Sequence, residues 1–238
     1  MTRYAEWFQS VTGVNRPAPN TFPAMSWTLD DKYGQQVNFA MVQAEAMFAA
    51  KLISELKTAD VPGVIVEFGV FTGDWIERLY TACQEIAFDR PLYGFDSFEG
   101  LPEPDSESDL DCWKQGDYSA ALDFVEKKLK TSERKDIHLI PGWFSDSLST
   151  PNAQNIKDIC FARIDCDLYA STVDCLEYLT NRLVDGSILV FDDWAFDIEK
   201  SETKAFFEWV PKVPHLRFEF LCFTSIGHIY FRVHYRDI

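Results

Sequence analysis

Short apolar runs alternate with amphipathic stretches along the middle of the chain. The apolar runs have the length of buried strands and lie at 64–68, 91–95, 136–140, 159–164 and 187–191. Between them, apolar residues recur at helical spacing, which predicts helices near 74–87, 118–130 and 171–183. Because strands joined by crossover helices run in the same direction, this alternation predicts a mainly parallel sheet with helices on both faces.

The two ends of the chain depart from this alternation. Residues 1–35 contain several prolines and no sustained period, which predicts a loop-rich N-terminal arm, and 38–57 then has the spacing of an amphipathic helix. Toward the other end, 199–210 predicts a helix, and 216–223 and 228–235 predict two antiparallel strands. With the five earlier strands they complete a seven-stranded, mostly parallel sheet of an α/β fold.

Composition and charge narrow the function classes. Of the 238 residues, 47% are hydrophobic and 15% aromatic, which is typical of a folded globule. The formal net charge of −16 argues against a nucleic-acid partner. Six cysteines form no C-x-x-C pair and lack zinc-ligand spacing, and no long apolar span occurs, so we expect a reduced cytoplasmic enzyme without a membrane partner.

The chain shows no internal repeat and no low-complexity linker. We therefore expect a single domain over 1–238. In it, residues 1–60 form an N-terminal lid and helix, and residues 61–238 form the ligand-binding core.

A glycine turn follows the first predicted strand. Glu67 closes an apolar run, and Gly69 and Gly73 follow before the start of a predicted helix. Glycine lets a backbone approach a ligand closely and adopt a positive φ. The spacing Glu-x-Gly-x-x-x-Gly differs from the G-x-G-x-x-G of dinucleotide-binding turns. It resembles the first motif of class I S-adenosylmethionine (SAM) methyltransferases, and an ordinary strand-to-helix turn is the alternative.

Acidic residues stand at the ends of four predicted strands. They are Glu67, Asp96, Asp165, Asp167, Asp192 and Asp193. Ligands bind outside the carboxyl ends of the strands in open parallel sheets, so these side chains are expected to converge on one rim. Crowded carboxylates repel one another, and the sequence around them is apolar. A bound cation or a hydrogen-bonding ligand is therefore favoured over a solvated edge.

Two residues near the strand ends suit a nucleoside. Asp96 ends the second strand, where nucleoside-binding α/β folds hold a ribose, because one carboxylate accepts two hydroxyl hydrogen bonds. Trp143 follows the third strand and offers a flat face for an adenine ring. The structural alternatives are a helix N-cap for Asp96 and a core aromatic for Trp143.

Three carboxylates form the most specific group of candidate ligands. Asp165, Asp192 and Asp193 supply the oxygen ligands that Mg²⁺ prefers, and a metal-bound hydroxyl has a lowered pKa. Asp167 lies two residues beyond Asp165 and is placed to take a proton from such a hydroxyl. The four histidines are expected to be structural, with His228 kept as an alternative base.

Five ordered motifs between about residues 61 and 195 resemble the macrocin O-methyltransferase-like family of class I SAM methyltransferases. They are Val61-Pro62-Gly63 with Glu67-Phe68-Gly69-Val70, Asp96-Ser97-Phe98-Glu99-Gly100-Leu101-Pro102, Gly142-Trp143-Phe144-Ser145-Asp146-Ser147-Leu148, Asp165-Cys166-Asp167-Leu168-Tyr169 and Asp192-Asp193. Asp74 stands where the family usually has a second glycine.

The resemblance implies a Rossmann-like class I fold and Mg²⁺-dependent methyl transfer from SAM to a sugar hydroxyl, often on an antibiotic or its precursor. It makes Asp165, Asp192 and Asp193 the metal ligands and Asp167 the general base. The predicted cofactor-binding residues are Glu67, Gly69, Gly73, Asp96, Ser97, Gly142, Trp143 and Asp165.

Several alternatives remain open at this point. A catechol-like hydroxyl is the second choice of acceptor. The D-x-D sequence at 165–167 also suits a haloacid dehalogenase-type phosphatase, although no lysine occurs in 168–191, or a Mg²⁺-dependent glycosyltransferase. A cofactor-binding scaffold without catalysis fits as well. For partners we expect a small-molecule hydroxyl acceptor and leave open a homodimer or higher homo-oligomer.

Overall fold

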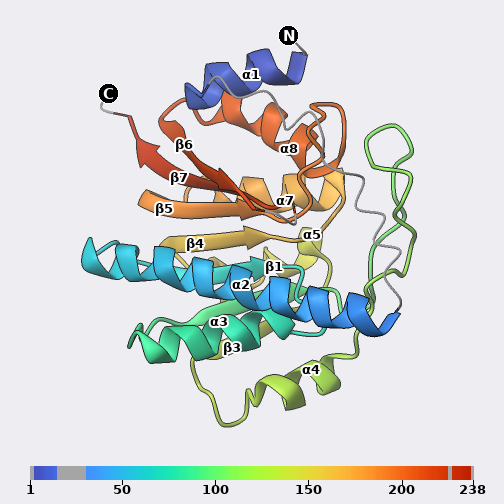
Figure 1. The fold of residues 1–238 in the computed structure, drawn as a ribbon, viewed down its shortest axis with the longest axis vertical. Coiled ribbons are helices and arrows are strands. Elements are labelled where there is room, and N and C mark those ends of the chain that lie inside the picture. Colours follow the sequence, from blue (N-terminus) through green and yellow to red (C-terminus); the bar gives the residue numbers. More distant parts are fainter. Residues whose placement is uncertain (1–2, 15–30, 225–226, 237–238) are drawn as a thin grey trace.

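The predicted sheet is present, with seven strands in the order β3-β2-β1-β4-β5-β7-β6 (Figure 1). The strands are β1 (Val64–Phe68), β2 (Leu92–Asp96), β3 (Ile137–Pro141), β4 (Ile159–Ile164), β5 (Leu183–Phe191), β6 (Leu216–Phe223) and β7 (Ile229–Tyr235). β7 lies between β5 and β6 and is antiparallel to both, whereas the pairs among β1–β5 are all parallel. The expected α/β fold with an antiparallel C-terminal strand is confirmed.

The computed structural model describes residues 3–14, 31–224 and 227–236, except the side chains of 31–42. Its helices are α1 (Arg3–Thr12), α2 (Asp31–Thr58), α3 (Asp74–Glu85), α4 (Leu122–Leu129), α5 (Phe144–Ser147), α6 (Pro151–Gln154), α7 (Tyr169–Leu179) and α8 (Ser201–Trp209), followed by the 3₁₀ turn η1 (Val210–Lys212). Helices α2, α3 and α4 pack on one face of the sheet, and α1 and α5–α8 pack on the other.

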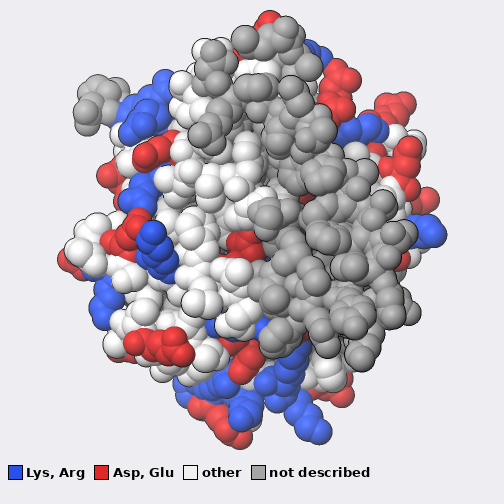
Figure 2. Space-filling view, in the orientation of Figure 1, with Lys and Arg blue, Asp and Glu red and all other residues white. Residues whose placement is uncertain are grey.

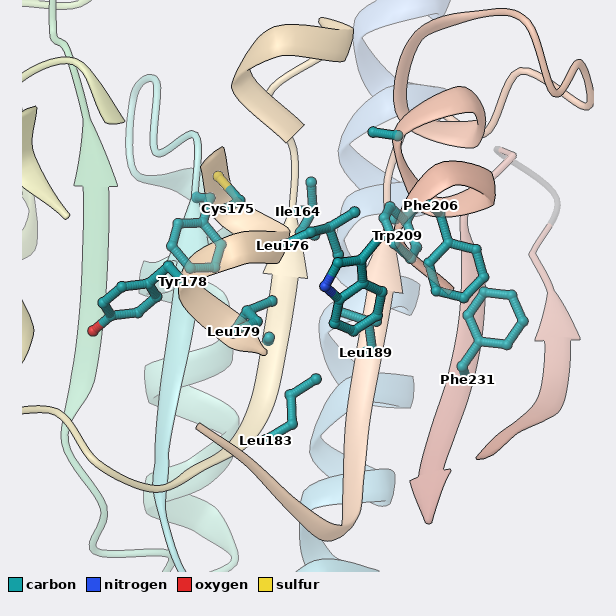
Figure 3. Packing of buried hydrophobic residues seen from close by; sticks show 14 of the residues in the cluster. Ile164, Cys175, Leu176, Tyr178, Leu179, Leu183, Leu189, Phe206, Trp209 and Phe231 are labelled. Carbon is teal, nitrogen blue, oxygen red and sulfur yellow. The ribbon is translucent and has the colours of Figure 1, made fainter. Parts of the chain in front are cut away.

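Each face of the sheet has its own apolar core. The larger core joins β4, β5 and β7 to α7 and α8, and Figure 3 shows Leu176, Phe206 and Phe231 converging there. The rings of Phe206 and Phe231 stack with centroids 5.1 Å apart, and both side chains are fully buried. Burying one such side chain stabilises a fold by roughly 1.5–3 kcal/mol. These cores hold the strand ends in fixed positions, which is what a site built on strand ends requires.

The glycine turn after β1 is shaped by close packing. Gly69 has φ 89°, and a Cβ atom there would overlap the carbonyl oxygen of Asp165 at the end of β4. Gly73 has φ 74° and caps α3, and its missing Cβ makes room for Leu129 of α4. Both glycines are therefore required by the chain itself, through backbone conformation and through contact with neighbouring elements.

The expectation of a loop-rich arm over 1–35 is wrong for the described part of that segment. Residues 3–12 form α1, whose side chains Tyr4 and Phe8 are buried one helical turn apart against the β6–α8 side of the molecule. The short Tyr4–Phe8 period was masked by the prolines that come later. Residues 15–30, which contain those prolines, lie outside the described residues.

Element boundaries account for the remaining differences. Helix α2 begins at Asp31, before the expected residue 38, and α4 begins at Leu122, after the expected residue 118. β5 begins at Leu183, inside the range expected for the preceding helix, and the short helices α5 and α6 were not foreseen. None of these shifts moves a strand end that carries a candidate site residue.

The basic residues near α4 belong to a mixed, charged surface. In Figure 2, Lys and Arg side chains at the α4 end of the molecule are interleaved with Asp and Glu. Lys128 pairs with Asp74 at 2.8 Å, and Arg134 donates to Glu77. Among the described residues, no helix combines the length and the apolar character needed to cross a bilayer.

Because Gly69 lies against Asp165, adding one methyl group at residue 69 should strongly lower the stability of the fold. Gly69→Ala should lower the free energy of unfolding by more than about 4 kcal/mol, because the backbones of β1 and β4 must separate. The matched control is Gly116→Ala, which has φ 84° but no atom within 4 Å of the added Cβ. It should cost only the ~1–2 kcal/mol of a left-handed alanine. Urea unfolding checks both, and equal losses would contradict the packing argument.

Candidate active site

A cavity of about 560 Å³ opens at the carboxyl ends of the parallel strands. The predicted site residues among those that line it are Gly69, Asp96, Ser97, Trp143, Asp165, Asp167, Asp192 and Asp193. Volumes of this size are typical of small-molecule and cofactor sites. The rim predicted from the strand ends is therefore a real hollow in the molecule.

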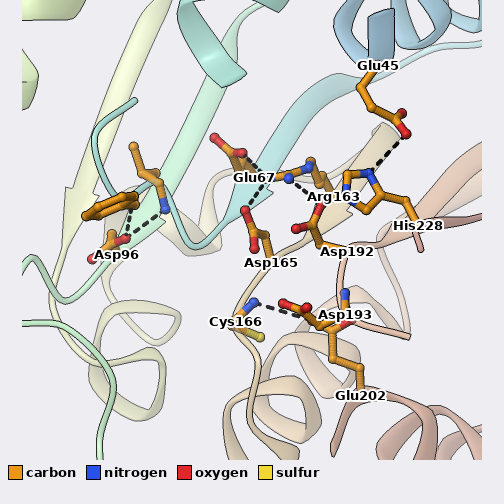
Figure 4. Close-up of polar contacts among 12 residues, drawn as sticks. Glu45, Glu67, Asp96, Arg163, Asp165, Cys166, Asp192, Asp193, Glu202 and His228 are labelled. Atoms are coloured by element: carbon orange, nitrogen blue, oxygen red, sulfur yellow. Dashed lines mark hydrogen bonds and ion pairs between the residues drawn. The ribbon is translucent and has the colours of Figure 1, made fainter. Parts of the chain in front are cut away.

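Arg163 lies at the centre of the acidic cluster, under the carboxyl end of the sheet (Figure 4). Its side chain is 6% exposed, and it projects from β4 next to Glu67 of β1, its neighbour in the sheet. One guanidinium nitrogen donates to Glu67 Oε1 at 2.6 Å and also to Asp165, and the other donates to Asp192. Three carboxylates from three neighbouring strand ends thus share one buried cation. A buried charge needs a partner of opposite charge to offset the cost of leaving water.

Asp192 has a second basic neighbour. The Nε2 atom of His228 lies 2.7 Å from Asp192 Oδ1. The other ring nitrogen, Nδ1, lies 3.2 Å from Glu45 Oε1, an ion-pair contact outside hydrogen-bond geometry. Burial disfavours the charged ring, but the adjacent carboxylates of Asp192 and Glu45 outweigh it and raise the pKa of His228 to about 10. His228 is therefore an imidazolium at neutral pH.

Glu202 connects the two turns that carry the acidic residues. It belongs to the first turn of α8 and is fully buried. Its carboxyl oxygens accept from the backbone nitrogen of Cys166 at 3.4 Å and from that of Asp193 at 3.1 Å. Burial, together with the charges of Asp193 and Asp192, raises the pKa of Glu202 well above its usual range. Through these two contacts Glu202 fixes the turn after β4 against the turn after β5.

Asp167 occupies a strained position at the cavity. It has φ 62°, at the centre of a tight turn in which the Leu168 nitrogen donates to the Cys166 carbonyl at 2.5 Å. Non-glycine residues in such conformations cost of order 1–3 kcal/mol and cluster at functional sites. Burial, with further contributions from Asp165 and Glu202, raises the pKa of Asp167 to about 8 against the lowering effect of its contact with Asp193.

The carboxyl groups of the trio Asp165, Asp192 and Asp193 have pKa values that burial and their neighbours shift in different directions. Burial, and the like charge of Asp192, raise the pKa of Asp165 to about 7 in spite of Arg163. Burial and the charges of Asp167 and Asp192 raise the pKa of Asp193 well above its usual range. Asp192 is the exception: burial opposes its ionisation, but Arg163 and His228 hold its pKa below the ordinary value.

One oxygen from each of Asp165, Asp192 and Asp193 lies within 4.8 Å of the others. The structure therefore brings the three predicted metal ligands together.

Asp96 holds the glycine turn in place. Its Oδ2 accepts from the backbone nitrogens of Val70 at 2.7 Å and Phe71 at 2.8 Å, and its Oδ1 accepts from Phe98 at 2.6 Å. These bonds connect the end of β2 to the turn after β1. Because Oδ1 has the only lone pair not used by these donors, Asp96 has less capacity for ribose hydroxyls than a free carboxylate.

Three of the predicted cofactor residues are not among the described lining of the cavity. Glu67 is 2% exposed and faces Arg163. Gly73 packs against α4, and Gly142 has φ 126° at the end of β3, near Ser147.

By contrast, Trp143 is half-buried and lines the cavity, so it is not a core residue. Ser97 also lines it and caps its own turn by accepting from the Glu99 nitrogen.

Besides Glu202, two groups of site residues were not predicted from the sequence. Arg163 had a usable signal, because a charged side chain inside the apolar strand 159–164 can be buried only if it is paired. The other group is an aromatic wall formed by Phe71, Trp113 and Tyr118, which reach the cavity from two loops and gave no signal in the sequence. The ring of Tyr118 meets those of Phe71 and Trp113 edge to face, with centroids 5.5 and 5.9 Å apart.

Comparison with known proteins agrees with this geometry. The family described as Macrocin-O-methyltransferase (TylF) matches residues 27–209. One relative is the 8-demethyl-8-(2,3-dimethoxy-alpha-L-rhamnosyl)-tetracenomycin-C 4'-O-methyltransferase of Streptomyces olivaceus. It is 33% identical to this chain over 148 residues, which cover 58% of this chain and 55% of that protein. The mycinamicin III 3''-O-methyltransferase of Micromonospora griseorubida is 28% identical over 147 residues, 56% of each chain. The chain therefore spans about half the length of the curated relatives it matches.

Solved structures share the fold. The O-methyltransferase NovP superposes with a TM-score of 0.64 at 22% identity, over 81% of this chain and 80% of that one. The calicheamicin methyltransferase CalS11 superposes with a TM-score of 0.61 at 22% identity, over 96% of this chain and 90% of that one. The matching family and the curated relatives are described as O-methyltransferases, and none of them is a phosphatase or a glycosyltransferase.

The position of Arg163 predicts a large and pH-dependent loss of stability. Arg163→Met leaves three carboxylates without their shared cation and should cost about 3–5 kcal/mol. Arg232→Met is the control, because Arg232 forms a half-exposed pair with Glu55 and should cost no more than about 1 kcal/mol.

The loss in Arg163→Met should also grow with pH. Carboxyl groups whose pKa is raised in the folded protein bind more protons there than in the unfolded chain, so stability falls as pH rises. Burial raises the pKa values of Glu67 and Asp165 and Arg163 lowers them, so without Arg163 these pKa values rise further and stability falls more steeply than in the wild type. Urea unfolding at pH 5 and pH 8 measures this. If Arg163→Met loses the same stability at both pH values, or no more than Arg232→Met loses, Arg163 does not have the proposed role as the shared cation.

Proposed function

The chain belongs to the macrocin-O-methyltransferase (TylF) family, and we propose that it transfers the methyl group of SAM to a hydroxyl of a sugar or glycosylated metabolite with the aid of Mg²⁺. One observation supports this above the others. The glycine turn at Gly69 and the trio of Asp165, Asp192 and Asp193 line a single cavity. A cofactor turn and a cation site therefore face the same space, as metal-assisted transfer to a hydroxyl requires.

The donor set fits a divalent cation. Among the described residues, the carboxyl groups of the cluster outnumber its two cationic side chains, Arg163 and His228. Burial raises the pKa values of Asp165 and Asp193, and the charges of neighbouring carboxylates raise them further. Oxygen ligands from carboxylates are those that Mg²⁺ prefers. When bound, Mg²⁺ supplies a Lewis acid that lowers the pKa of the acceptor hydroxyl, and SAM supplies an activated methyl group.

The residues of the chain position the reactants and move the proton. Gly69, Ser97 and Trp143 border the part of the cavity next to the glycine turn, where the backbone can approach a cofactor closely. Asp165, Asp192 and Asp193 hold the cation. A carboxylate oxygen of Asp167 takes the acceptor's hydroxyl proton, and any neighbouring positive charge lowers the pKa of Asp167 toward the ionised form that this role needs.

The lining also bears on the acceptor. The described residues of the cavity include six aspartates and no Lys, Arg or His. A phosphate-bearing acceptor would bring like charge close to these carboxylates, which is unfavourable by several kcal/mol near a protein surface. The aromatic rings of Phe71, Trp113 and Tyr118 provide apolar faces for a sugar or an attached ring system. An uncharged glycoside, such as an antibiotic or its precursor, therefore fits best.

The proposed activity is tested by incubating the protein with labelled SAM and a panel of sugars, glycosides and catechols. Methyl transfer to a sugar hydroxyl should stop with chelator and return with added Mg²⁺, while SAM binding survives. Full activity after exhaustive chelation would reassign the trio to structural hydrogen bonding. Preferred transfer to a catechol would overturn the choice of acceptor, and failure to bind SAM would overturn the choice of cofactor.

The two acids of the D-x-D pair should differ. Asp165→Asn removes a proposed metal ligand and should weaken cation binding as well as rate. Asp167→Asn keeps a side chain that tolerates the left-handed backbone, so cation and SAM binding should stay nearly unchanged while kcat falls by about 10²–10⁴-fold. Calorimetry and initial rates separate the two variants. Wild-type kcat in Asp167→Asn would place the base elsewhere.

A further inference from the structure

The carboxylate of Asp192 is held from two sides. Its Oδ1 atom accepts from Arg163 on β4 and faces His228 Nε2, at the start of β7, at 2.7 Å. An ionised carboxylate oxygen has about two lone-pair sites, so these two contacts use the capacity of Oδ1. Oδ2 is then the oxygen of Asp192 that has lone pairs left for a metal ion.

His228 is itself fixed by helix α2. The residue is 7% exposed, and its Nδ1 lies 3.2 Å from Glu45 Oε1 (Figure 4). The second oxygen of Glu45 accepts from the hydroxyl of Tyr230 at 2.5 Å. Glu45 is 5% exposed and Tyr230 is 1% exposed, so the whole line of contacts from α2 to Asp192 is shielded from water.

We propose that Glu45 and His228 are positioning residues that orient Asp192 and thereby set the affinity of the site for its divalent cation. This inference rests on the metal role proposed for Asp192. Neither residue lines the described cavity, so neither is placed to touch the reactants. Their effect is carried by the Asp192 side chain, in the way that partners of a ligating side chain fix its orientation in metal sites.

A purely structural role makes a different prediction. If His228 and Glu45 only packed α2 onto the sheet, their loss would lower stability and weaken cation and cofactor binding together. If they orient Asp192, cation affinity should fall while SAM affinity stays, because the cofactor turn at Gly69 is held separately by Asp96. The ratio of the two affinities therefore distinguishes the roles.

The experiment titrates Mn²⁺ into the protein without SAM and follows free Mn²⁺ by electron paramagnetic resonance, with SAM binding measured in parallel by calorimetry. His228→Leu keeps the bulk but removes both ring nitrogens, and it should weaken Mn²⁺ binding by about tenfold or more. His228→Gln can place an amide nitrogen near the position of Nε2 and should recover most of that loss. Glu45→Gln keeps an acceptor for Tyr230 and should weaken Mn²⁺ binding less than His228→Leu.

His234→Gln is the matched control. His234 also sits on β7 and contacts a carboxylate, that of Glu219 at 2.8 Å, but on the β6 side. This variant should bind Mn²⁺ as the wild type does. If His228→Leu and Glu45→Gln bind Mn²⁺ within twofold of wild type, the proposal is wrong while the proposed function stands. If the wild type binds no Mn²⁺, the metal part of the proposed function is overturned, and the inference with it.

Discussion

A guanidinium group buried beneath the carboxyl end of the sheet sets the arrangement of everything around it. Arg163 gathers Glu67, Asp165 and Asp192, which come from three neighbouring strand ends, into one compact set of charges. Without such a partner, the cost of burying these carboxylates would drive them apart or into water. The acidic rim is thus held together by its cations, and the clustered carboxylate oxygens of Asp165, Asp192 and Asp193 are what make it suited to a further cation.

The cofactor side of the cavity is built on a different principle. There the chain relies on the absence of side-chain atoms at Gly69 and on backbone hydrogen bonds to Asp96. A single carboxylate that accepts three backbone donors makes a rigid turn from a segment that has little regular structure of its own. A rigid backbone beside a rim of firmly held carboxylates is a sound basis for holding bound molecules in one orientation.

Much of this was accessible from the sequence, for identifiable reasons. The apolar runs located the strands because parallel strands are buried on both faces, and the rule that ligands bind at strand ends brought Asp165, Asp192 and Asp193 together. Helix α1 was missed because only one turn of its apolar period is visible near the prolines. Glu202 was not predicted as part of the site, and His228 was expected to be structural or an alternative base. The observed contacts of both join segments far apart in the chain.

The position of β7 has a consequence for how the protein comes to be active during its synthesis. β7 is made after every other strand, yet it lies between β5 and β6, and β6 has no other neighbour in the sheet. β6 can therefore join the sheet only once β7 has arrived, and the same strand delivers His228 to Asp192. Long-range pairing of this kind forms late. A partly synthesised chain could hold the turn at Gly69 in place before His228 reaches Asp192, so the rim would take its final arrangement only in the finished fold.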